Sequence, residues 1–129
     1  MYAGDCFVSS DRSNQGDGHH LWVVVSDPFQ NDKEVLIVNL TSVRGGRFED
    51  LCCVFEANEH EWITHTSYVA FDCAQVHTDA YLDRCQKVGA ITIWKSFPLP
   101  LLERIRKAAP KTKNLTGDQL QLLVEQGLC

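Results

Sequence analysis

Two apolar segments separated by a turn constrain the fold more than any other feature of the sequence. Residues 20–26 and 34–42 are dense in β-branched side chains, and Asp27 and Pro28 stop the first segment before a turn over residues 28–33. Apolar residues occupy successive positions in both segments, which predicts strands that are buried on both faces. We therefore expect these two strands to lie at the centre of the fold.

Shorter segments extend this pattern along the chain. We expect further strands over residues 4–10, 51–55, 67–74 and 91–94, and turn-forming polar loops over residues 11–18 and 43–50. Apolar residues at helical spacing predict helices from residue 79 until Gly89, over residues 98–108, and over residues 116–126 with Thr116 as the N-cap.

The order of these elements predicts the fold class. Five or six short strands with long loops, and no alternation of strands and helices, indicate a small antiparallel barrel that is closed or nearly closed. We expect a single domain over residues 1–129, mainly β with C-terminal helices (α+β). The barrel would occupy residues 1–95, and a helical tail would occupy residues 96–129.

The charge distribution limits the classes of partner. The net charge of -5 argues against binding nucleic acid through general electrostatics, because affinity for phosphates needs clustered cations. A local patch is still available, since residues 95–113 hold six basic side chains and one acidic side chain. A solvated helix face and loop explain that basic stretch equally well.

Targeting signals and cysteines bear on the compartment. The apolar runs are far shorter than the ~20 residues of a membrane span, and the first residues lack the basic and apolar segments of a secretory signal. The six cysteines are scattered, and several lie in apolar, strand-like runs where we expect buried, reduced thiols. We therefore expect a cytoplasmic protein that does not contact a membrane.

Histidines near strand entrances are the candidate chemical groups. His19 and His20 stand at the mouth of the second strand, and His60 and His65 precede a later strand that begins with Ser67. Histidine titrates near neutrality and is the usual general acid or base. A single loop histidine is nevertheless more often solvated than catalytic, so the prediction depends on several of them converging.

Metal binding and cysteine chemistry are weaker alternatives. The nearest possible ligands are Cys52, Cys53, His60, His65 and Cys73, but structural zinc sites use cysteines separated by two to four residues. Adjacent strand residues point to opposite faces, so the pair Cys52 and Cys53 is poorly placed to share one ion. We expect no metal ion and no other cofactor, and no cysteine nucleophile.

Three stretches of sequence resemble the PemK/MazF-like toxin family. These are Gly4-Asp5 before the first strand, GHHLWVVVSDP over residues 18–28, and VNLTS over residues 38–42. The resemblance covers about residues 4–75. It implies an SH3-like barrel, a homodimer, and a bacterial or phage toxin that cleaves single-stranded RNA and is inhibited by an antitoxin protein. Thr41 matches the hydroxyl of the family's third strand, whereas His19 or His20 stands where the family has an arginine.

The resemblance and the residues together predict a metal-independent endoribonuclease. His20 and His65 would be the acid–base pair, with Thr41 and Ser67 as hydroxyl groups of the catalytic site. Trp22 or Trp62 would stack a base if exposed. The residues expected to contact RNA are Arg44, Arg47, His19, His60 and Tyr68. The alternative is a non-catalytic barrel that binds a protein or nucleotide through the same rim.

Overall fold

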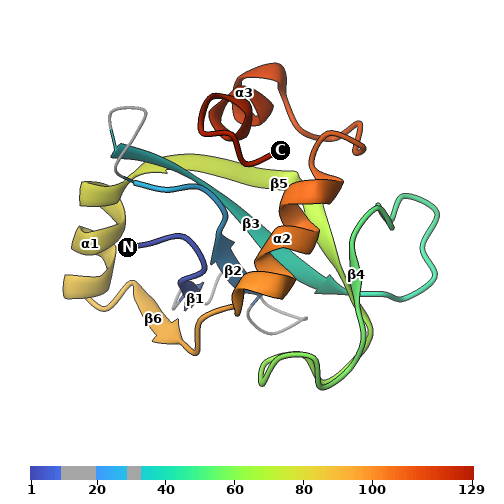
Figure 1. The fold of residues 1–129 in the computed structure, drawn as a ribbon. Helices are drawn as coiled ribbons and strands as arrows, with labels where there is room; N and C mark the ends of the chain where they lie inside the picture. Colours follow the sequence, from blue (N-terminus) through green and yellow to red (C-terminus); the bar gives the residue numbers. More distant parts are fainter. Residues whose placement is uncertain (10–19, 29–32) are drawn as a thin grey trace.

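The computed structural model describes residues 1–9, 20–28 and 33–129, and these ranges form six strands and three helices (Figure 1). The strands are β1 (Cys6–Ser9), β2 (Leu21–Val24), β3 (Glu34–Ser42), β4 (Val54–Phe55), β5 (Ser67–Thr78) and β6 (Ile91–Trp94). The helices are α1 (Asp79–Lys87), α2 (Leu99–Ala108) and α3 (Gly117–Glu125). The predicted loop 11–18 and most of the predicted turn 28–33 lie outside the described residues.

The six strands form one antiparallel sheet in the order β4-β5-β3-β2-β1-β6. β3 and β2 occupy its middle, so the prediction that these apolar strands are central is confirmed, and so is the α+β class. The order leaves β4 and β6 at the two edges, and no ladder joins them in the described part of the chain. An SH3-like barrel stays a prediction.

The two faces of the sheet are covered by different helices (Figure 1). On one face, which we call the α2/α3 face, Leu36, Val38 and Phe71 belong to a core that also includes Ile105 of α2 and Leu123 of α3. The opposite face, called the α1 face, carries a smaller core. Its buried members are Phe7, Val24, Val35, Ile37, Leu82 and Ile91. The helical tail is therefore packed on the sheet and completes its larger core.

Strand β5 is longer than the sequence predicts. We expected it to end at residue 74, but it continues through the polar residues Gln75 and His77 to Thr78. A register shift between Ile37 and Asn39 allows the second half of β5 to pair with the apolar first half of β3. Long-range pairing therefore overrides the local composition of this segment.

Local capping explains where the helices begin. The Thr78 side chain accepts from the Tyr81 backbone N–H at the start of α1. The predicted N-cap Thr116 is confirmed and forms a reciprocal capping box with Gln119. In α2 a proline stands in the first turn, where its missing N–H costs nothing. None of the helices in the described part of the chain has the length and apolar character of a membrane span.

The six cysteines are free thiols, but their burial differs from the expectation. Cys6 and Cys53 are buried, and this burial raises the pKa of each to about 12. The expectation of buried thiols does not hold for three exposed cysteines, Cys52, Cys73 and Cys129. The first of them lies in a turn, because the strand predicted over residues 51–55 begins only at Val54.

Candidate functional site

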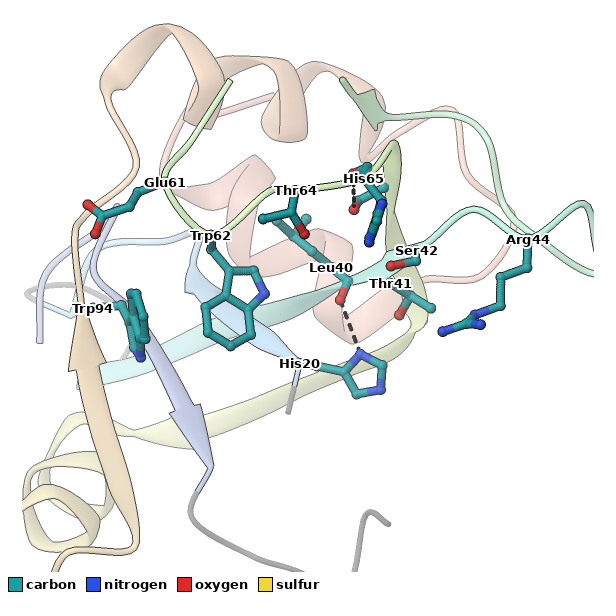
Figure 2. Close-up of a pocket in the computed structure, with 11 residues that line it drawn as sticks. His20, Leu40, Thr41, Ser42, Arg44, Glu61, Trp62, Thr64, His65 and Trp94 are labelled. Atoms are coloured by element: carbon teal, nitrogen blue, oxygen red, sulfur yellow. Dashed lines mark hydrogen bonds between the residues drawn. The ribbon is translucent and has the colours of Figure 1, made fainter. Parts of the chain in front are cut away.

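A cavity of about 500 Å³ lies where the central strands end, and we call it the histidine pocket (Figure 2). Antiparallel pairing brings together the end of β3, the start of β5 and the residue before β2. The connection from β4 to β5 and the last residue of β6 complete the wall. The lining residues are His20, Leu40, Thr41, Ser42, Arg44, Glu61, Trp62, Thr64, His65, Ser67 and Trp94.

His20 is held by the backbone of β3. Its ring lies beside the Thr41 side chain, and its Nδ1 is 3.2 Å from the carbonyl oxygen of Leu40 (Figure 2). A carbonyl oxygen accepts but does not donate, so Nδ1 carries the proton in this hydrogen bond. In the neutral ring Nε2 then holds a lone pair, which is what a general base needs.

His65 reaches the same cavity from a different segment. It is exposed and lies on the connection that leads into β5. The buried Ser67 hydroxyl donates to the carbonyl oxygen of His65 at 2.9 Å, which closes a short turn. The predicted catalytic role of Ser67 is not favoured, because its hydroxyl proton is used in this hydrogen bond to the backbone of His65.

Thr41 and Arg44 supply hydrogen-bond donors on the side of the pocket away from Trp94 (Figure 2). The Thr41 hydroxyl is half-buried and donates to Asn39 Oδ1 over a long 3.4 Å, a contact that a better acceptor can replace. Just beyond β3, the Arg44 backbone N–H donates to the Glu49 carboxylate at 2.8 Å. This contact fixes the loop backbone that carries the Arg44 side chain at the rim.

The β4–β5 connection, which carries Glu61, Trp62 and His65, is anchored to α2. Arg104 Nη1 lies 2.6 Å from Glu59 Oε1, and Nη2 donates to the Val54 carbonyl oxygen at 2.7 Å. The hydrogen bond from Arg104 lowers the pKa of Glu59 below its usual value. The segment that carries these three pocket residues is therefore held in place by α2.

His60 is a second anchor of this connection, and its burial does not favour its predicted role as an RNA contact. Its side chain is 5% exposed, and its ring packs on Phe97 with centroids 4.9 Å apart. Nε2 donates to the Lys95 carbonyl oxygen at 2.8 Å, and Nδ1 accepts from the Trp62 backbone N–H at 3.1 Å. With both nitrogens used, His60 joins the connection to the segment after β6.

Two tryptophans form a wall that the sequence predicts only in part. The rings of Trp62 and Trp94 meet edge to face, with centroids 4.9 Å apart and planes at 76°. Both are half-buried, and both pack against the larger core on their other side. Trp62 was a candidate for base stacking, whereas Trp94 was not. No local spacing signals Trp94, because pairing of β6 with β1 brings it here.

The remaining predicted RNA contacts among the described residues do not line the pocket. Arg47 is exposed but does not line the pocket. Tyr68 pairs with Thr41 in the sheet but is not among the lining residues, and burial followed by the Glu49 carboxylate raises its pKa. His19 lies outside the described residues. The predicted stacking residue Trp22 lines a different cavity, on the α1 face.

No set of three or more His, Cys, Asp or Glu side chains converges as a metal site within residues 1–9, 20–28 and 33–129. A scan of the sequence against models of protein families gives no match, and a search of curated proteins finds no similar sequence. The PemK/MazF-like resemblance therefore stays a prediction.

Proposed function

We propose that the protein is a metal-independent endoribonuclease that cleaves single-stranded RNA in the histidine pocket. The observation that carries this proposal is that His20 and His65, from distant segments, line one cavity together with Thr41 and Arg44. Two imidazoles supply the base and the acid of a proton-transfer reaction. The threonine hydroxyl and the guanidinium supply hydrogen bonds to phosphate oxygens.

The reaction uses the 2′-hydroxyl of the RNA as its nucleophile. His20 Nε2 takes the proton of that hydroxyl while its oxygen forms a bond to the adjacent phosphorus. The bond from phosphorus to the 5′-oxygen breaks, and protonated His65 gives its proton to the leaving oxygen. The products are a 2′,3′-cyclic phosphate and a 5′-hydroxyl. Each imidazole contributes about 10²- to 10⁴-fold to the rate.

Charge stabilisation falls to the neighbouring donors. The Thr41 hydroxyl would leave its long contact with Asn39 and donate to a non-bridging phosphate oxygen. Arg44 would offer a bidentate, charge-assisted hydrogen bond to the same phosphate from the rim. Ser67 acts through the backbone of His65, as a positioning residue.

The family resemblance extends this proposal to the biological setting. It favours an SH3-like barrel fold, a homodimer and a cytoplasmic toxin of a toxin–antitoxin system, inhibited by a protein partner. Co-expression with the product of a neighbouring gene tests this setting, because relief of growth arrest is the expected result. Growth that is unaffected by expression of the protein alone would contradict the toxin role.

The direct test is cleavage of a fluorescent single-stranded RNA of mixed sequence in the presence of a chelator. We expect His20→Ala and His65→Ala each to lower the rate by at least about 100-fold. The matched control is His77→Ala, which removes an imidazole from the α1 face and should leave the rate unchanged. Circular dichroism checks the fold of each variant. Full activity in either pocket variant would overturn the mechanism.

The net charge of -5 favours a second candidate, a non-catalytic module that binds a nucleotide in the same pocket. An acidic surface slows association with a long polyanion but matters less for a single nucleotide. Cleavage of RNA distinguishes the two candidates. If the protein is the module, it binds a mononucleotide in calorimetry and leaves RNA uncut.

A further inference from the structure

The two ends of the histidine pocket differ in chemistry (Figure 2). Trp62, Trp94 and Glu61 lie at one end, and Arg44 lies at the other, with the His20 and His65 side chains on the Arg44 side of Trp62. A nucleotide has the same polarity, because a flat apolar base is joined through a sugar to an anionic phosphate. The arrangement therefore orients a bound nucleotide with its base toward the tryptophans.

The tryptophan end forms an aromatic corner, defined by Trp62 and Trp94. Two rings at 76° and 4.9 Å form two walls of an L, so a base that stacks on one ring turns its own edge toward the face of the other. Because the core fixes the far side of both rings, the corner is formed before any ligand arrives. Stacking alone accepts every base, since each has a π-face.

Glu61 adds a group that distinguishes bases. It is exposed at this end of the pocket, and no hydrogen bond or ion pair joins its side chain to another residue in the described ranges. An ionised carboxylate accepts hydrogen bonds and donates none. Guanine presents two adjacent N–H donors on its Watson–Crick edge. Adenine and cytosine present one donor beside an acceptor, and uracil presents one donor between two acceptors.

We infer that the aromatic corner binds a guanine base of the RNA and that Glu61 is the specificity-determining residue. Guanine would satisfy both carboxylate oxygens while stacked, whereas every other base would turn at least one acceptor toward the negative charge. This inference rests on the proposed function for its substrate class. It adds a residue and a base preference that the catalytic groups do not require.

The test measures binding without cleavage. Four 2′-deoxy tetranucleotides that differ at one position, as G, A, C or T, lack the 2′-hydroxyl nucleophile, and tryptophan fluorescence reports their binding. We expect the G-containing strand to bind about tenfold more tightly than the others. Glu61→Gln should remove this preference, and Trp94→Ala should weaken binding of all four strands.

Matched controls separate the site from general effects. Glu103→Gln removes the same charge from an exposed position on α2, outside the pocket lining, and should keep the guanine preference. Trp22→Phe removes the chain's third tryptophan, on the α1 face, and should leave the fluorescence change intact. Loss of preference in the Glu103 variant would show that net charge, and not Glu61, selects the base.

The results distinguish this inference from the proposed function. Equal binding of the four strands overturns the guanine site, while the cleavage assay with His20 and His65 variants still decides the nuclease proposal. Preference for the G-containing strand without cleavage of the matching ribonucleotide overturns the nuclease proposal and leaves the guanine site standing. Absence of binding to any strand overturns the guanine site.

Discussion

Two cavities of similar size lie on opposite sides of the sheet in the described part of the molecule, and each is lined by histidine and aromatic side chains. The histidine pocket measures about 500 Å³, and the cavity on the α1 face measures about 610 Å³. In the latter, His77 stacks on Tyr81 with centroids 4.8 Å apart, and its Nε2 is 2.7 Å from Gln75 Oε1. Burial lowers the pKa of His77.

The difference between the two cavities lies in what surrounds the imidazole. The histidine pocket combines two imidazoles with a guanidinium and hydroxyl groups, whereas the α1-face cavity has no lysine or arginine among its described lining residues. Its imidazole is instead placed against an aromatic ring and an amide. Neither the volume of a cavity nor the presence of a histidine indicates a reactive site. The other polar and charged side chains around the imidazole distinguish the two cavities.

Thr41→Val is the variant with the largest expected effect on the rate of RNA cleavage, and it tests whether the hydroxyl groups set the histidine pocket apart. The substitution keeps the shape of the side chain and removes the proposed donor to the phosphate, so we expect kcat to fall about 100-fold with little change in KM. Thr92→Val is the control, because Thr92 is an exposed strand residue of β6 outside both cavities. Cleavage rates at a series of RNA concentrations give kcat and KM for both variants. An unchanged kcat would remove Thr41 from the catalytic set.

His60→Phe tests whether the histidine pocket depends on its buried anchor. Phenylalanine keeps a ring against Phe97 but leaves the Trp62 N–H and the Lys95 carbonyl oxygen without their partner. We expect the free energy of unfolding to fall by about 2 kcal/mol, the cost of unsatisfied buried groups. Urea denaturation measures the loss. A change below about 0.5 kcal/mol would mean that water replaces the ring.

Local sequence patterns predict the central strands of this fold, whereas the strand predicted over residues 51–55 is reduced to Val54–Phe55. The segment that becomes β3 was predicted with its observed bounds, because apolar residues at positions 35–38 and 40 stand between a turn and a polar loop. The end of β5 was missed, since pairing with β3 and not composition decides it. Helix starts were predictable at Thr116, where the cap is encoded within four residues.

The pocket shows the same division between local and long-range information. Strand entrances indicated His20 and His65, and the structure brings both to one cavity. Burial of His60 and the approach of Trp94 depend on contacts between segments that are distant in the sequence. Composition of a single segment contains no signal for either. The catalytic roles themselves stay predictions until cleavage is measured.

His77→Phe tests the α1-face cavity and has the smallest expected effect. Burial lowers the pKa of His77 from its usual value of 6.5. As the pH falls below 6.5, the imidazole is therefore protonated in the unfolded chain before it is protonated in the folded chain. Folded stability is therefore fully present above pH 6.5 and declines as the pH falls toward the lowered pKa. Phenylalanine keeps the stacking on Tyr81 and cannot titrate. Between about pH 7.5 and 5.5, we expect the variant to lose a few tenths of a kcal/mol less than the wild type in urea denaturation. His77→Gln should flatten the dependence equally, and parallel curves for all three proteins would mean that this imidazole is as solvated in the folded chain as in the unfolded one.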